Sequence, residues 1–414
     1  MKILIITSRY PPLGASGHDV RCQQVAEALS VCGHRLQVLT SNYRVPPGGV
    51  STDKGVYREF VLSADLTDEQ LSQLSYQDVY AIDFENTGAL DDRLSRFSPD
   101  LVMVWGCDLL SKSLLMRLQQ SGVPVAFDLH GNWLQSEAFD RDPWQWWWKH
   151  QHSFSARMRK SMMTLTGARR RAWAKLPVYD RSELDFSLSW LASESLRETL
   201  VKDGLQEISP VPFVYSALKP NITEPKRHYT HTGRLMWAGR LTEGKAPGLA
   251  LEAISELNKI GEEVSLDIYG MGESYERKAI RERINEMGLQ DSVEMVAIRS
   301  GEIMKHYANY DALLVTSQCD DPFPMTPVEA MMVGLPCIVS IDGGLPEIVD
   351  DGQTALLYER GNSQALVAAI QRFLGLSDAG AGLAVECRRN LQQKYSMQAY
   401  IDKLQDVVFS KLPL

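Results

Sequence analysis

Residues 321–352 read DPFPMTPVEAMMVGLPCIVSIDGGLPEIVDDG, and this stretch contains one helix–strand–helix unit. The first helix is expected to end at Gly334, and the apolar run 336–340 follows it as a buried strand. Two glycines then permit a tight backbone approach before a second helix that begins at Pro346. Polar residues thus come directly after strands, which is where open α/β sheets bind their ligands.

Short apolar runs of the same kind recur along the chain in two sets. The first set is 2–7, 35–40, 100–105, 124–129 and 187–192. The second set is 234–239, 264–270, 293–297, 311–317, 336–340 and 355–358. Helical patterns lie between them, among others at 19–30, 248–260 and 274–287. Because the runs do not alternate apolar with polar residues, they are typical of parallel sheets that are covered on both faces. We therefore predict an α/β fold with two Rossmann-like doubly wound domains.

The break between the two sets lies near residues 211–230, where proline and polar residues cluster as in a linker. We predict an N-terminal domain over 1–210, with a basic, tryptophan-rich insert at about 132–182, and a C-terminal domain over 211–395. Residues 396–414 should form a final helix with an apolar stripe, which must pack on one of the two domains.

Composition excludes several classes of protein. The 414 residues are 44% hydrophobic and 23% charged, as in a globular protein and unlike a disordered chain. The net charge of −9 disfavours binding to nucleic acid over the whole surface. Six scattered cysteines, with no C-x-x-C pair, are typical of reduced thiols in the cytoplasm. No apolar run is long enough to span a bilayer, and the first residues read as a buried strand rather than a signal peptide.

Two loops that follow strands contain candidate anion-binding groups. PPLGASGHD (11–19) opens a helix, and its glycines let backbone N–H groups approach an anion, although a plain turn fits equally well. His18 in this loop could bind a ligand or stabilise the turn. In GRLTEGK (239–245), Arg240 and Lys245 could both reach one diphosphate, or they could be two solvated cations.

Two carboxylates follow another strand. Asp321 lies in a proline-rich loop, and Glu329 should lie one or two turns into the helix that ends at Gly334. Carboxylates at the end of a sheet accept hydrogen bonds from the hydroxyls of sugars and riboses. The two acids and the two cations together predict a site for an activated sugar.

These stretches resemble the retaining family-4 glycosyltransferases of GT-B fold, and the resemblance covers nearly the whole chain. Its most specific part is the E-x7-E region with the G-L-P and G-G-x-P-E strings that follow it, here within 321–347. The G-R-L-x-x-x-K string matches at 239–245, and the glycine-rich turn matches loosely at 14–17. The resemblance implies a nucleotide-sugar donor on the C-terminal domain and an acceptor (a glycan, a lipid-linked glycan or a small molecule) on the N-terminal domain.

The resemblance also implies a role for each matching residue. Arg240 and Lys245 would hold the donor diphosphate, Glu329 the ribose and Asp321 the transferred sugar, and His130 would lie by that sugar. Backbone contacts are implied from Gly17 to the diphosphate and from Phe323, Pro324 and Met325 to the sugar.

The chain departs from the family pattern at three places. Asp321 is one methylene shorter than the usual glutamate, and Tyr215 and Ser216 replace the usual Asn-Gly pair. Ala297 replaces a glycine, and this substitution places Arg299 near the base of the donor in our interpretation.

The charge distribution predicts catalysis without a divalent metal or other cofactor, because cations and a helix N-terminus can stabilise the departing diphosphate. The D-x-D string at 140–142 does not follow a strand, so we do not interpret it as a metal site. The family implies same-face attack, with the leaving phosphate accepting the proton of the acceptor. An epimerase, or a binding protein without activity, remains an alternative on the same fold.

The insert has a composition of its own. Between residues 141 and 182 there are ten basic and two acidic residues, together with five of the nine tryptophans. Phe154, Met158, Met162 and Leu165 recur at helical spacing. Three interpretations remain open: a peripheral contact with the cytoplasmic face of a membrane, an apolar stripe packed on the N-terminal sheet, or a lid over the acceptor.

Overall fold

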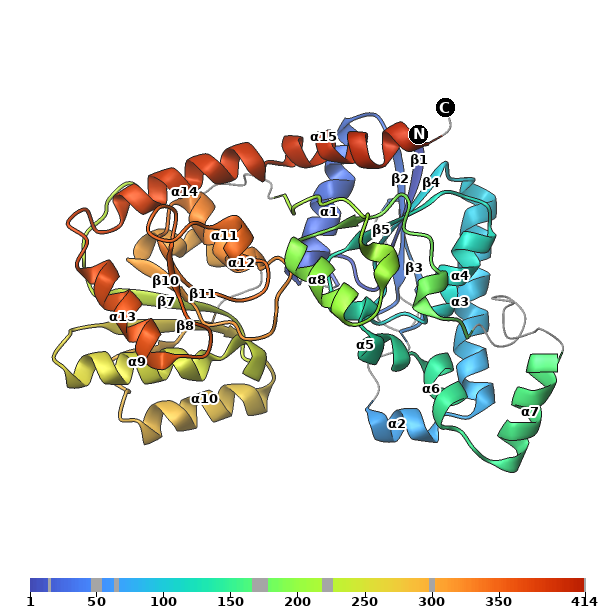
Figure 1. Cartoon of the computed structure of the whole chain (residues 1–414), viewed down its shortest axis with the longest axis horizontal. Helices are drawn as coiled ribbons and strands as arrows, with labels where there is room; N and C mark the ends of the chain where they lie inside the picture. Colours follow the sequence, from blue (N-terminus) through green and yellow to red (C-terminus); the bar gives the residue numbers. More distant parts are fainter. Residues whose placement is uncertain are drawn as a thin grey trace. The chain divides into compact units, whose positions relative to one another are not determined.

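The computed structural model describes residues 1–13, 16–45, 54–62, 67–165, 178–217, 226–297 and 302–412. The chain forms two compact units (Figure 1). The first unit comprises Met1–Ala192, Leu196–Tyr215 and Tyr400–Leu414. The second unit comprises Ser193–Ser195 and Ser216–Ala399.

The first unit is built on a six-stranded parallel sheet of order β3-β2-β1-β4-β5-β6. Its strands are β1 (Lys2–Thr7), β2 (Arg35–Ser41), β3 (Val56–Phe60), β4 (Leu101–Gly106), β5 (Val125–Leu129) and β6 (Trp190–Leu191). The central strands are apolar on both sides, and Ile3 through Ile6 are completely buried. The strand predicted at 187–192 is present as β6 but is shorter than expected.

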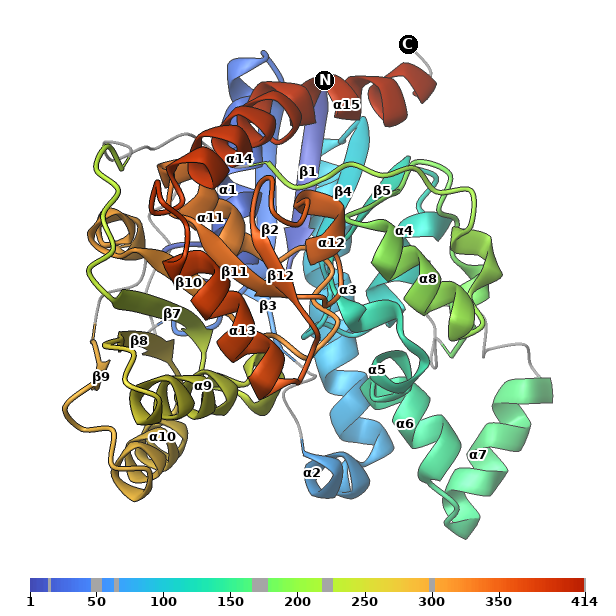
Figure 2. The same ribbon diagram turned by 60° about the vertical axis from the view of Figure 1, so that its left-hand side comes forward.

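Helices cover both faces of this sheet. Figures 1 and 2 show α1 on one side and α3 and α4 on the other. The helices that belong wholly or mostly to the first unit are α1 (Gly17–Val31), α2 (Asp68–Gln73), α3 (Tyr76–Phe97), α4 (Ser113–Gln120), α5 (Ser136–Asp140), α6 (Pro143–His150), α7 (Phe154–Leu165), α8 (Glu194–Lys202) and α15 (Met397–Val407).

The second unit repeats the design with strand order β12-β11-β10-β7-β8-β9, again all parallel. Its strands are β7 (Arg234–Arg240), β8 (Ser265–Met271), β9 (Val293–Met295), β10 (Ala312–Val315), β11 (Cys337–Ser340) and β12 (Leu356–Tyr358). Its helices are α9 (Pro247–Lys259), α10 (Ser274–Glu286), α11 (Met325–Val333), α12 (Leu345–Ile348), α13 (Ser363–Leu374) and α14 (Ala381–Lys394). In Figure 1, α9, α10 and α13 lie on one side of this sheet, and α11 and α14 on the other.

The two sheets have the same topology. Counted within each unit, the strand order is 3-2-1-4-5-6, so the order reverses between the first and fourth strands. In doubly wound sheets, ligands bind beyond the carboxyl ends of the strands at this reversal. The prediction of two Rossmann-like doubly wound domains is confirmed, and the reversal places a candidate site after β1 and β4 in one unit and after β7 and β10 in the other.

The final helix packs on the first unit. Ser396 accepts a hydrogen bond from the backbone N–H of Ala399 (3.2 Å), and Leu404 and Val408 are completely buried. The ring of Phe409 stacks on His34 with a centroid separation of 5.1 Å. The apolar stripe expected in this helix therefore covers part of the N-terminal sheet unit.

Candidate functional site

The loops after β7 and β10 are joined to each other at the reversal point of the second sheet. The backbone N–H of Gln318 donates to the carbonyl of Gly244 (2.7 Å), and the Thr316 hydroxyl donates to the carbonyl of Lys245 (2.8 Å). A Cβ atom on Gly244 would lie only 2.8 Å from the Cβ of Cys319, so only glycine fits there without a shift. These contacts hold the backbone of Lys245 beside the loop that leads to Asp321.

Lys245 and Asp321 form an ion pair at this point. The Lys245 Nζ lies 2.5 Å from Asp321 Oδ2 and 3.2 Å from the Ser317 hydroxyl. Both charged side chains are partly buried, with relative exposures of 18% and 26%. The structure therefore brings together one predicted diphosphate ligand and one predicted sugar ligand, although they are separated by 76 positions in the sequence.

Glu329 lies in α11, which ends at Gly334 as predicted. Its Oε2 accepts a hydrogen bond from the hydroxyl of Tyr307 (3.4 Å), and Tyr307 is completely buried. Burial raises the pKa of Glu329 to about 7, and the Tyr307 hydrogen bond only partly opposes that rise. Near neutral pH this carboxyl can therefore gain or lose a proton, and its charge depends on the groups that approach it.

The start of α11 is formed by residues of the same loop. Phe323 and Pro324 are buried, and no side chain caps the helix, for which Pro324 is the N-cap residue. Proline at position 327 has no backbone N–H, so the first turn has only the amides of Met325 and Thr326 to offer to a ligand. These amides suit an anion or a sugar hydroxyl.

The two glycines after β11 pack closely against the loop that contains Asp321. A Cβ atom on Gly343 would lie 2.2 Å from the Asp321 carbonyl oxygen, and one on Gly344 would lie 2.0 Å from the Pro322 carbonyl oxygen. The Gly344 N–H also donates to the Asp321 carbonyl (3.0 Å). The tight approach predicted at this turn therefore exists, and it positions the backbone of residues 321 and 322.

One further predicted ligand of the donor, Arg240, is not joined to this cluster by any contact in the described ranges. Arg240 is the last residue of β7, its side chain is exposed, and it forms no ion pair within the described part of the chain. Arg299 lies outside the described residues. Its predicted role near the base stays a prediction.

In the first unit, His130 directly follows β5 and is 9% exposed. Its ring stacks on His18 with a centroid separation of 5.1 Å. His18 Nε2 lies 2.9 Å from the carbonyl oxygen of Trp105, which can only accept, so Nε2 carries the proton. Burial and the charge of Arg21 lower the pKa of His18 to about 4, so His18 is neutral near pH 7. Both histidines therefore lie near the reversal point of the first sheet, and His18 supports the ring of His130.

Gly17 is the first residue of α1, and Ser16 caps this helix. Ser16 and Asp19 form a reciprocal capping box, with distances of 3.2 Å and 2.9 Å. The cap uses the amide of Asp19 and leaves those of Gly17 and His18 without a side-chain cap. Gly14, the other glycine of the predicted turn, lies outside the described residues.

Sequence reasoning missed a buried ion pair whose arginine, Arg21, lies near His18. Arg21 on α1 and Asp128 on β5 are each 1% exposed, and the Arg21 guanidinium donates to Asp128 Oδ2. The guanidinium also lies over the ring of Trp105, 4.3 Å from its centroid. Burial raises the pKa of Asp128 to about 6 despite this partner. The one signal in the sequence is an aspartate inside the apolar run 124–129.

The aspartates of the D-x-D string have structural partners. Asp142 is the N-cap of α6, where it accepts from the backbone N–H groups of Trp144 (3.0 Å) and Lys112 (2.7 Å). Asp140 forms an ion pair with Lys149 (2.5 Å). Over the described ranges, His, Cys, Asp and Glu side chains form no group of three or more that could hold a metal ion. Catalysis without metal stays a prediction.

The structure contradicts one of the three interpretations of the insert. Trp144 and Trp147 are buried, but the stripe of Phe154, Met158 and Met162 is exposed. The interpretation that this stripe packs on the N-terminal sheet is therefore wrong, because the opposite face of the helix makes the contact with the protein. Trp173 lies outside the described residues.

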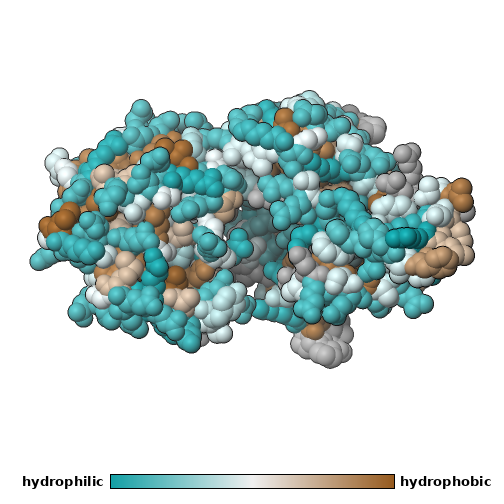
Figure 3. Space-filling model, turned by 60° about the horizontal axis from the view of Figure 1, so that its bottom comes forward, coloured by the Kyte–Doolittle hydropathy of each residue, from teal (hydrophilic) through white to brown (hydrophobic). Residues whose placement is uncertain are grey.

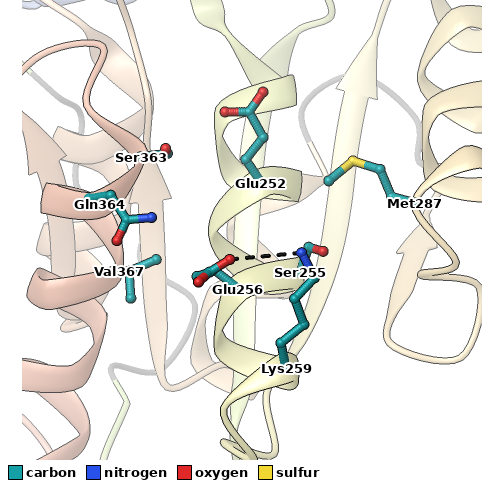
Figure 4. A pocket seen from close by; sticks show the side chains of 8 residues that line it. All are labelled: Glu252, Ser255, Glu256, Lys259, Met287, Ser363, Gln364 and Val367. Carbon is teal, nitrogen blue, oxygen red and sulfur yellow. Dashed lines mark ion pairs between the residues drawn. The ribbon is translucent and has the colours of Figure 1, made fainter.

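A surface groove also lies on the flank of the second unit, between α9 and α13 (Figure 4). Its lining includes Glu256 and Lys259, whose charged groups lie 3.8 Å apart. None of the predicted site residues lines this groove, and it follows helices rather than strand ends. We do not assign a function to it.

Part of the chain is similar in sequence to known glycosyltransferases. Residues 219–394 match the family model of glycosyl transferases group 1. A putative colanic acid biosynthesis glycosyltransferase, WcaL of Salmonella typhimurium, is 29% identical over 167 residues. This match covers 39% of the present chain and 41% of that relative, so the chain spans about two fifths of the relative's length.

Two solved structures match almost the full chain. Sucrose-phosphate synthase from Thermosynechococcus elongatus superposes with a TM-score of 0.70 at 17% identity, covering 98% of both chains. Anabaena HepE, crystallised with UDP-glucose, superposes with a TM-score of 0.67 at 17% identity, covering 99% of this chain and 100% of that one. At this identity the likeness shows the fold, and the GT-B architecture is confirmed.

Proposed function

We propose that this chain is a glycosyltransferase that moves a sugar from a nucleotide-sugar donor to a hydroxyl group of an acceptor. The Lys245–Asp321 ion pair is the observation that carries the proposal. It lies at the strand reversal of the unit that matches the glycosyl transferase model. A cation and a carboxylate held together at this place can bind the two halves of one donor, its diphosphate and its sugar.

In this proposal, the donor makes its polar contacts with the loops after β7 and β10 and with α11 of the second unit. Lys245 and Arg240 bind the diphosphate, and the two amides at the start of α11 add partial positive charge. Glu329 accepts hydrogen bonds from the ribose hydroxyls, and Asp321 from the transferred sugar. The role implied for Arg299 at the base falls on a residue outside the described ranges. The roles implied for Gly17 and His130 of the first unit stay predictions.

The chemical step follows from where charge develops. As the glycosyl–phosphate bond breaks, negative charge accumulates on the diphosphate, and Lys245 and Arg240 stabilise it without a metal ion. The sugar becomes oxocarbenium-like, and the acceptor hydroxyl attacks the same face from which the diphosphate leaves. Its proton passes to the leaving phosphate oxygen. Because attack and departure use the same face, the anomeric carbon keeps its configuration.

The acceptor is a glycan, a lipid-linked glycan or a small molecule that contains a free hydroxyl. The WcaL relative is named for colanic acid biosynthesis, and this supports a role of the present chain in polysaccharide or glycolipid assembly. All six cysteines are free thiols, and four are buried, which suits a reducing cytoplasm.

Two substitutions test the proposed function. Lys245→Ala and Arg240→Ala should each lower kcat/KM for sugar transfer by about 10²–10³-fold, because each removes a charge that stabilises the leaving group. Lys278→Ala is the matched control, since it removes an exposed cation of α10 in the same unit and should leave kcat/KM unchanged. The measurement is transfer, or slow hydrolysis, of a radiolabelled nucleotide sugar.

Three results would contradict the assignment. If Lys245→Ala retains near-normal kcat/KM, Lys245 does not bind the diphosphate. If the wild-type chain binds a nucleotide sugar but neither transfers nor hydrolyses it, the chain is a binding protein. Conversion of the donor sugar into its epimer in the absence of acceptor, seen by NMR, would identify an epimerase.

A further inference from the structure

Helix α7 presents an exposed apolar face. Phe154, Met158, Met162 and Leu165 are 82%, 59%, 61% and 87% exposed. At 3.6 residues per turn, these four positions lie within an arc of about 80° around the helix. We call them the apolar stripe. Figure 3 shows hydrophobic side chains at the right-hand end of the view, where α7 lies in Figure 1.

The opposite face of α7 is attached to the first unit. Ala156 and Met163 are 5% and 7% exposed, and both pack in a cluster with Trp144 and Trp147. The Arg159 guanidinium lies over the ring of Tyr76, 3.9 Å from its centroid. These contacts fix the orientation of the helix on the first unit. The apolar stripe, on the opposite face, therefore points away from the unit.

The charged side chains within α7 are all positive. Residues 154–165 read FSARMRKSMMTL and contain Arg157, Arg159 and Lys160 but no acidic residue. Residues 141–182 have ten basic and two acidic side chains, although the whole chain has a net charge of −9. A surface of this kind is complementary to an anionic layer, and an apolar stripe beside cations is the composition of a helix that lies in a membrane interface.

We propose that α7 is a docking helix for an anionic membrane surface. The apolar stripe enters the boundary between headgroups and acyl chains, and Arg157 at its edge contacts the lipid phosphates. The helix lies in the plane of the membrane and does not cross it. Within the described residues, no helix is both long and apolar enough to span a bilayer. This docking goes beyond the proposed sugar transfer and does not depend on it.

Liposome flotation of the full chain tests the proposal. The wild-type chain should float with vesicles of phosphatidylcholine and phosphatidylglycerol at low salt. Binding should fall at high salt or with phosphatidylcholine alone, because both conditions weaken the attraction to lipid phosphates. A double variant, Phe154→Glu with Leu165→Glu, should lose at least about tenfold in vesicle affinity, because it places two charges in the stripe.

The matched control is Phe84→Glu. Phe84 is a 66% exposed aromatic residue of α3 in the same unit, outside the stripe, and the substitution should leave flotation unchanged. The double variant and the Phe84→Glu control should both have the circular dichroism spectrum of the wild-type chain and its affinity for a nucleotide sugar. These two readouts separate failure of docking from failure to fold and from failure of the proposed function.

Three outcomes would overturn the docking proposal. The first is a wild-type chain that does not float with anionic vesicles at low salt. The second is a double variant that floats as well as the wild type. The third is self-association that depends on concentration in light scattering and disappears in the double variant, because the stripe would then be an interface between two copies of the chain.

Discussion

At the scale of single residues, Glu329 shows how the site balances stability against binding. A partly buried carboxyl whose pKa is raised from 4.5 to about 7 destabilises the folded chain when it is ionised. The unfolded chain ionises this group near its ordinary pKa. The cost therefore begins above about pH 4.5, grows as pH rises, and is complete above about pH 7.

Glu329→Gln should therefore raise the melting temperature at pH 8 but change it little near pH 4.5. The same variant should bind a nucleotide sugar more weakly at pH 8, because an amide oxygen is a poorer acceptor for ribose hydroxyls than a carboxylate. Differential scanning calorimetry and titration calorimetry measure the two effects. Glu282→Gln, at an exposed position of α10, is the control. A melting-temperature difference that does not depend on pH would contradict the raised pKa.

The sequence predicted some residues of the site and missed others for a physical reason. Lys245 and Asp321 each follow a strand, and the ends of adjacent parallel strands meet at one edge, so their proximity was predictable. Arg21 and Asp128 are 107 positions apart, and only the packing of α1 on β5 brings them together. No local pattern encodes that contact.

At the scale of elements, the loops around the donor site fit together through glycine. Gly344 has an ordinary negative φ, so backbone strain does not require glycine there. Glycine is required because a Cβ atom would collide with the carbonyl of Pro322. Gly343 has a φ of +50° in addition to its close contact, so both causes apply to it. The loop after β11 thus sets the position of the loop that contains Asp321.

Gly344→Ala should destabilise the second unit by more than about 1 kcal/mol and weaken donor binding, because the 321–322 backbone must move. Gly248→Ala is the contrast in the same unit. Its Cβ would meet Arg283 Nε at an ordinary 3.6 Å, and alanine in a helix should leave stability unchanged or raise it by about 1 kcal/mol. Urea denaturation compares the two variants. Equal stabilities would show that the close approach of Gly344 to the Pro322 carbonyl does not require glycine.

The strand that the sequence analysis missed, β3, lies at an edge of its sheet. The central strands are continuous apolar runs, and their positions were predictable to within a few residues. Strand β3 reads VYREF and is mostly half-buried at the edge of its sheet, so it has no such run. The stripe on α7 had the correct helical period, but a period cannot show which side of a helix meets the protein.

At the scale of the whole molecule, the chain passes from the first unit to the second and then returns. Residues from Tyr400 onward belong to the first unit, and Leu404 is completely buried there. The last helix therefore contributes to the core of the unit that also contains the N-terminus. Met1 and the last described residue, Leu412, both belong to that unit.

Leu404→Ala should destabilise the first unit by about 2–5 kcal/mol, because it leaves a cavity under α15. Lys403→Ala, at the preceding exposed position, should change stability by less than about 0.5 kcal/mol. Hydrogen exchange read by mass spectrometry should show faster exchange in β1 and α1 of Leu404→Ala and unchanged exchange in β10 and α11. Faster exchange confined to the second unit would contradict the assignment of α15.

Binding of a nucleotide sugar to the second unit is the central claim, and titration calorimetry measures it most directly. UDP-, GDP-, ADP- and dTDP-sugars should be titrated into the wild-type chain and into Lys245→Ala. We predict that one of these donors binds the wild-type chain and that Lys245→Ala weakens its binding by at least about tenfold, equivalent to about 1.4 kcal/mol. Binding of no donor, or equal binding to both proteins, would contradict the account.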